Sequence, residues 1–164
     1  MNRKMSRKML SKMLLCAAAV LFVAVGISYA AAGDAFMGTW QLNEAKSKMA
    51  AGATKNSTVV YAMSGDNITC TIDGTDGSGQ ALHTQWTGKF DGKDYPVTGD
   101  PASDMRSYRM ISSHTLSATD SKSGKVTDRA RIVVSADGKT RTVTVHSTDA
   151  KGMRTTTIAV YDKQ

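Results

Sequence analysis

The chain has 164 residues, with 21 Lys and Arg against 14 Asp and Glu, which gives a formal net charge of +7. Five of the basic residues and none of the acidic ones fall within residues 1–30, so the remainder carries 16 − 14 = +2. The basic excess of the whole chain is therefore no indication of nucleic-acid binding. The part beyond residue 30 has the length of one domain. Cys70 is its only cysteine, which excludes an internal disulfide there.

Residues 1–30 have the pattern of a secretory signal peptide. A basic start without acids is followed by an apolar run over residues 14–27, and the small residues Ser28 and Ala30 then provide a cleavage motif. The apolar run is shorter than the ~20 residues that span a bilayer. We expect cleavage at Ala30/Ala31 or at Ala32/Gly33. The mature chain is then predicted to be periplasmic or extracellular, with no transmembrane segment.

Gly38, Thr39 and Trp40 begin the first predicted strand. Thr39 and Trp40 suit a half-buried strand, and Gly38 would allow neighbouring backbone to approach closely. We expect Trp40 to close one end of a barrel. Asn43 is a suitable N-cap, so residues 43–49 are predicted to form a short helix before the remaining strands.

From there on, apolar and polar residues alternate with the period of two that is typical of β-strands. The predicted strands cover residues 58–63, 68–72, 80–90, 93–97, 105–111, 115–120, 126–135, 140–148 and 153–161. Tight turns join them, and Asp91-Gly92 is interpreted as a two-residue hairpin turn. The short connections favour an antiparallel up-and-down β-barrel of 8–10 strands spanning residues 31–164, because closing the sheet removes its exposed edges. A β-sandwich is the competing architecture.

Several short motifs resemble proteins of the calycin superfamily, which contains the lipocalins and the fatty-acid-binding proteins. The motifs over residues 38–47 and 90–99, together with Val160-Tyr161, are most similar to a family of exported bacterial lipocalin-like proteins, mostly of unassigned function. The resemblance implies a barrel that binds a small apolar or amphipathic molecule. Fatty-acid-binding proteins hold the ligand carboxylate with an arginine two residues before a tyrosine of the last strand. Here Ala159 precedes Tyr161, so that clamp cannot be carried over.

Extending the alternation identifies side chains that would face the barrel interior. The candidates for the ligand pocket are Tyr61, Met63, Trp86, Arg106, Tyr108 and Ile132. The strand from Met105 has two possible faces: either Arg106, Tyr108 and Met110 point inward, or Met105 and Ile111 do. Trp86 either lines the pocket or fills the core.

The sequence offers little support for catalysis. His83, His114 and His146 are scattered, with no second ligand at metal-binding spacing on the same strand. No Gly-x-Ser-x-Gly motif is present. We therefore expect no enzyme, no metal, no cofactor and a monomer. The leading hypothesis is an exported barrel that binds a small hydrophobic or amphipathic ligand in its interior. The alternative is a protein-interaction or inhibitor module that has a filled core and acts through its hairpin loops.

Overall fold

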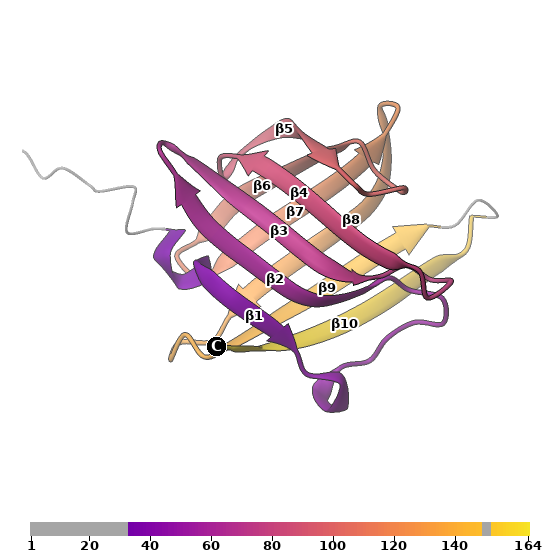
Figure 1. Cartoon of the computed structure of the whole chain (residues 1–164), viewed down its shortest axis with the longest axis horizontal. Helices are drawn as coiled ribbons and strands as arrows, with labels where there is room; N and C mark the ends of the chain where they lie inside the picture. The colour runs from indigo at the N-terminus through magenta and orange to yellow at the C-terminus, as the bar shows by residue number, and fades with distance from the viewer. Residues whose placement is uncertain (1–32, 149–151) are drawn as a thin grey trace, which may run out of the picture.

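Ten antiparallel strands close into one barrel (Figure 1), which confirms the predicted all-β, up-and-down architecture. The computed structural model describes residues 33–148 and 152–164, so the predicted signal peptide lies outside the described residues. The strands are β1 (Gly38–Leu42), β2 (Lys55–Ser64), β3 (Asn67–Thr75), β4 (Ala81–Gly88), β5 (Asp91–Thr98), β6 (Met105–Ser112), β7 (Thr115–Lys122), β8 (Lys125–Val134), β9 (Thr140–Thr148) and β10 (Arg154–Lys163).

Each strand pairs with the next one along the chain, and β1 closes the ring between β2 and β10. Trp40 lies opposite Val59 of β2 on one side and opposite Lys163 of β10 on the other. Closure gives each described strand a neighbour on both sides, although β4 and β5 pair only at Gln85 with Thr98 and at Trp86 with Val97. It also creates an enclosed interior that the alternating inward side chains share.

In the described part of the chain the named helical segments are two short 3₁₀ helices, η1 (Asp34–Phe36) and η2 (Glu44–Lys46). Asn43 caps η2 as predicted, because its side chain accepts a hydrogen bond from the Lys46 N–H at 3.1 Å. The helix is shorter than the predicted 43–49 segment, since Lys48 already forms a β-bridge with Ile158. Within the two described ranges no helix has the length and hydrophobicity needed to cross a membrane.

The predicted hairpin turn at Asp91-Gly92 is wrong. β4 ends at Gly88, and Asp91 is already part of β5, where it lies opposite Arg109 of β6. The register of β5 and β6 shifts between Asp91 and Asp94, so Gly92 lies in a β-bulge with a φ of +81°. An Asp-Gly pair supplies a positive φ equally well to a turn and to a bulge, which is why the sequence pattern does not separate the two.

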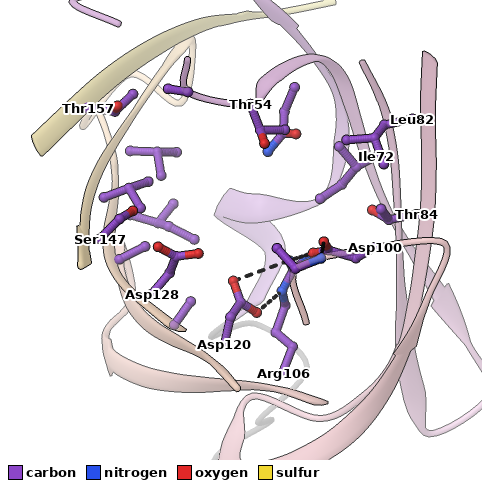
Figure 2. Close-up of a pocket in the computed structure, with 18 of the residues that line it drawn as sticks. Thr54, Ile72, Leu82, Thr84, Asp100, Arg106, Asp120, Asp128, Ser147 and Thr157 are labelled. Carbon is purple, nitrogen blue, oxygen red and sulfur yellow. Dashed lines mark hydrogen bonds and ion pairs between the residues drawn. The ribbon is translucent and has the colours of Figure 1, made fainter. Parts of the chain in front are cut away.

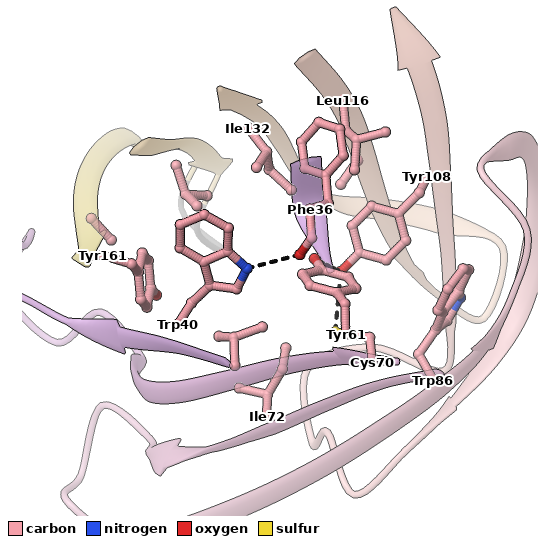
Figure 3. Close-up of a cluster of buried hydrophobic side chains, with 14 of the residues drawn as sticks. Phe36, Trp40, Tyr61, Cys70, Ile72, Trp86, Tyr108, Leu116, Ile132 and Tyr161 are labelled. Atoms are coloured by element: carbon pink, nitrogen blue, oxygen red, sulfur yellow. Dashed lines mark hydrogen bonds between the residues drawn. The ribbon is translucent and has the colours of Figure 1, made fainter. Parts of the chain in front are cut away.

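One end of the barrel is closed by Phe36 and Trp40, as Figure 3 shows. Both side chains are fully buried, and the Trp40 Nε1–H donates to the Phe36 carbonyl oxygen at 2.8 Å. This position is compatible with the expectation that Trp40 closes one end. Gly38 was predicted to allow a close approach of neighbouring backbone. In the structure it instead adopts a φ of +103°, which other residues rarely adopt.

Two glycines at the opposite end of the barrel have the same backbone conformation but different surroundings, so substituting each one separates steric overlap from backbone strain. Gly99 and Gly124 both have a φ of +75°. A Cβ on Gly99 would lie 2.0 Å from the His83 carbonyl oxygen, whereas one on Gly124 would meet no atom within 4 Å. We expect Gly124→Ala to lower the free energy of unfolding by about 1 kcal/mol through backbone strain. Gly99→Ala should lose a further 1–3 kcal/mol or so, because β4 must move aside.

Urea denaturation of the two variants, followed by circular dichroism, measures this difference. Equal destabilisation would mean that the loop after β5 moves away from His83 at little cost.

Candidate ligand-binding cavity

The barrel interior contains a cavity of about 420 Å³. Exposed residues, among them Ala51, Gly52 and Ala102, line one end of it, so the cavity reaches solvent there. The buried side chains of Tyr61 and Tyr161 line it toward the end closed by Trp40. Its volume lies within the ~300–1,000 Å³ that is usual for small-molecule sites.

The middle of the cavity has apolar walls contributed by strands on opposite sides of the barrel. These walls include Ile72, Leu82, Ala118, Ala130, Ile132 and Val143. Figure 2 shows the lining side chains arranged in a ring that points inward. Apolar ligand surface buried against them would contribute roughly 25 cal/mol per Å².

A charged cluster lies near the open end and is called the mouth cluster here: Asp100, Arg106 and Asp120. The Arg106 Nε–H donates to Asp120 at 2.5 Å, and its Nη2 group lies 3.3 Å from Asp120 Oδ2 and 3.4 Å from Asp100 Oδ2 (Figure 2). Asp100 is held in place by the Ser103 hydroxyl, which donates to it at 2.7 Å. The three side chains thus form a partly buried ion-pair network that points into the cavity.

Carboxylates outnumber the guanidinium at this end. Burial raises the pKa of Asp120, Arg106 opposes that rise, and the neighbouring carboxylates of Asp100 and Asp128 add to it. Asp128 also lines the cavity, and its carboxylate forms no hydrogen bond or ion pair with another described side chain. Among the described residues that line this end of the cavity, three carboxylates and one guanidinium give a formal charge of 1 − 3 = −2.

A second buried arginine lies toward the closed end. Arg141 of β9 is only 3% exposed and is opposite Tyr161 of β10 in the sheet register. Its guanidinium lies over three aromatic rings, 4.5 Å from the centroid of Tyr161, 5.5 Å from that of Tyr61 and 5.8 Å from that of Trp40. Figure 3 shows these three rings grouped at that end of the barrel.

The guanidinium of Arg141 is incompletely satisfied. Its Nε and Nη1 atoms are buried without a hydrogen-bond partner in the described part of the chain, and no described carboxylate forms an ion pair with it. Cation–π contact is worth up to about 2 kcal/mol when desolvated, whereas burying a charge costs several kcal/mol, and each unmade hydrogen bond adds about 1–3 kcal/mol. The aromatic rings therefore offset only part of the cost of burying Arg141.

A buried polar network borders the cavity between the two arginines. The Tyr61 and Tyr108 hydroxyls are 3.3 Å apart, and the Cys70 Sγ lies 3.9 Å from the Tyr108 hydroxyl. Burial raises the pKa of Tyr61, of Tyr108 and of the Cys70 thiol, so all three stay protonated at neutral pH. They serve as neutral hydrogen-bonding groups.

Four of the six pocket candidates line the cavity: Tyr61, Arg106, Tyr108 and Ile132. The sequence left open which face of β6 points inward. The structure shows that it is the face with Arg106, because Arg106 is buried whereas Ile111 is 52% exposed. The inward arginine beside an inward tyrosine is thus the arrangement that the protein adopts.

The prediction that Met63 lines the ligand pocket is wrong. Its side chain is 59% exposed and does not line the cavity. β1 begins at Gly38, opposite Tyr61, so Met63 extends past the start of β1 toward the hairpin tip. Alternation along β2 continues there, but the barrel wall that would cover the side chain has ended.

Trp86 fills the core instead of lining the cavity. It is 1% exposed, its ring packs at 4.8 Å against Tyr108, and its Nε1–H donates to the Arg106 carbonyl oxygen at 2.9 Å. Trp86 therefore contacts two cavity-lining residues of β6, Arg106 and Tyr108.

Sequence reasoning did not identify Arg141, Asp120 or Asp128. Continuing the period of two would have found one of them, because Asp128 is four residues before Ile132, which was predicted to face inward. A charged residue at an inward position breaks the apolar pattern, which makes it a signal of function.

Comparisons with known proteins add no information about this site. No family model matches the chain, and no curated protein matches it. The function has therefore to be argued from the cavity and its charged groups.

Proposed function

We propose that this barrel binds a small amphipathic molecule in its interior, as an exported carrier that does not alter its ligand chemically. The observation that carries the proposal is the buried guanidinium of Arg141, which faces the cavity with two unpaired donor atoms. An anionic group on the ligand would pair with this charge and accept its hydrogen bonds.

The remaining walls support the same proposal. An amphipathic ligand would place its polar group at Arg141 and its apolar part against Ala130, Ile132 and their neighbours. Cys70 and Tyr108 stay protonated because burial raises the pKa of each, so neither is an activated nucleophile or base. A binding role therefore fits the lining better than a catalytic one. The alternative of an interaction module requires a filled core, and the cavity of about 420 Å³ argues against it.

Two phenylalanine substitutions on β8 test whether ligands enter the interior. Ala130 lines the cavity, whereas Val133 is 37% exposed on the outer face. The neutral fluorescent probe N-phenyl-1-naphthylamine should bind the wild-type protein. Ala130→Phe should weaken its binding at least tenfold by filling the cavity, and Val133→Phe should leave it unchanged.

Fluorescence titration gives the dissociation constants, and circular dichroism confirms that both variants are folded. Native mass spectrometry of protein purified from its own host should in addition show a bound small molecule. Failure of the probe to bind, or equal binding by both variants, would refute interior binding.

A further inference from the structure

We infer that the ligand is dipolar, with an anionic group at Arg141, an apolar middle, and a cationic or hydrogen-bond-donating group at the open end beside Asp128. This inference rests on the proposed function and specifies its ligand class. It follows from two side chains of opposite charge, Arg141 and Asp128, that line a single cavity and form no ion pair with any described residue.

The first charge is the guanidinium of Arg141, which requires an acceptor. It is buried to 97%, since its exposed fraction is 3%, and its Nε and Nη1 atoms have no partner among the described residues. Guanidinium groups stay charged throughout the pH range in which proteins fold. The closed end therefore favours a ligand group with negative charge.

The second charge is the carboxylate of Asp128, which Figure 2 shows directed into the cavity near Asp120. The guanidinium of Arg106 is already engaged by Asp120 and Asp100, so it does not neutralise Asp128. With Asp128 included, the described residues that line the open end of the cavity carry three carboxylates against one guanidinium. A second anionic group on the ligand would be repelled there, whereas an ammonium or other donor would be attracted.

The sheet register separates the two charges along the barrel. Arg141 lies opposite Val134, and Asp128 lies opposite Ser147, which is six residues further along β9. At about 3.3 Å per residue the two levels are about 20 Å apart along the strand. Apolar side chains such as Ile132 and Val143 line the space between them. An extended molecule with polar groups at its two ends fits this arrangement.

Four ten-carbon probes test the inference by displacement of N-phenyl-1-naphthylamine at neutral pH: 10-aminodecanoate, decanoate, decanedioate and decylamine. We expect 10-aminodecanoate to bind at least fivefold more tightly than decanoate, although its second charge makes it less hydrophobic. Decanedioate should bind more weakly than decanoate, because its outer carboxylate meets Asp128.

Two variants test whether Asp128 at the open end and Arg141 at the closed end of the cavity cause these differences in affinity. Asp128→Asn should abolish the advantage of 10-aminodecanoate over decanoate. Arg141→Met should weaken the binding of 10-aminodecanoate and of decanoate at least tenfold and leave that of decylamine unchanged. The matched controls are Asp137→Asn, in the exposed β8–β9 turn, and Arg131→Met, on the outer face of β8. Each control changes the net charge equally and should leave every affinity unchanged.

The outcomes separate this inference from the proposed function. Equal binding of the four probes by the wild-type protein, or an advantage of 10-aminodecanoate that survives Asp128→Asn, would overturn the dipolar ligand and leave interior binding intact. Failure of the neutral probe to bind at all would refute the proposed function itself. The wild-type probe series and Asp128→Asn decide the inference even where Arg141→Met does not fold.

Discussion

Replacing Trp40 with alanine is expected to lower the free energy of unfolding by about 3–5 kcal/mol. The indole is fully buried, donates a hydrogen bond to the Phe36 carbonyl oxygen and packs against the cations of Arg141 and Lys163. Its loss would open a cavity at the closed end and remove the contact that holds Phe36 there. For a single domain this is a large part of the total stability.

Urea denaturation followed by far-ultraviolet circular dichroism measures this effect without relying on tryptophan fluorescence. Trp40→Phe should fall between the wild type and Trp40→Ala, because it keeps an aromatic ring but leaves the Phe36 carbonyl without its donor. Met63→Ala is the control, since Met63 is 59% exposed, and it should change stability by less than about 0.5 kcal/mol. A loss below about 1 kcal/mol for Trp40→Ala would show that the indole does not close the barrel.

Replacing Arg106 with methionine is expected to destabilise the protein by about 3–5 kcal/mol, because it removes the guanidinium from two partly buried carboxylates. Asp120 and Asp100 would then face each other and Asp128 without a counter-charge. The double variant Arg106→Met/Asp120→Asn should recover part of the loss, since it also removes one of the stranded charges. Arg109→Met, at an exposed position of the same strand, is the control and should be nearly neutral.

The pH dependence of Arg106→Met provides a second measurement. Burial already raises the pKa of Asp120 in the wild type, and losing Arg106 removes the opposing effect. A carboxyl group whose pKa is higher in the folded than in the unfolded state binds more protons when folded, so stability rises as pH falls through that range. The deficit of Arg106→Met relative to the wild type should therefore shrink between neutral pH and the ordinary Asp range. A deficit that stays constant with pH would indicate lost packing instead of stranded charge.

The strands and their antiparallel order could be predicted from the amino-acid pattern alone. Alternation with a period of two and short turns are local signals, and an up-and-down sheet needs little more, because each strand pairs with its neighbour along the chain. The same signals placed Tyr61, Tyr108 and Ile132 inside. They failed at Met63, since alternation does not show where the adjacent strand β1 begins.

Which charged side chains meet could not be predicted from the sequence pattern and depends on the three-dimensional fold. Arg141 and Tyr161 become neighbours through the β9–β10 register, whereas Arg106 and Asp120 do so through the β6–β7 register. Closure of the ring then brings Trp40 of β1 and Tyr61 of β2 against Arg141 inside the barrel, because β1 and β2 follow β10 in the closed strand order. Whether an inward charge finds a counter-charge depends on these long-range pairings, and no local pattern in the sequence contains them. The unpaired guanidinium on which the proposed function rests is therefore a property of the closed barrel.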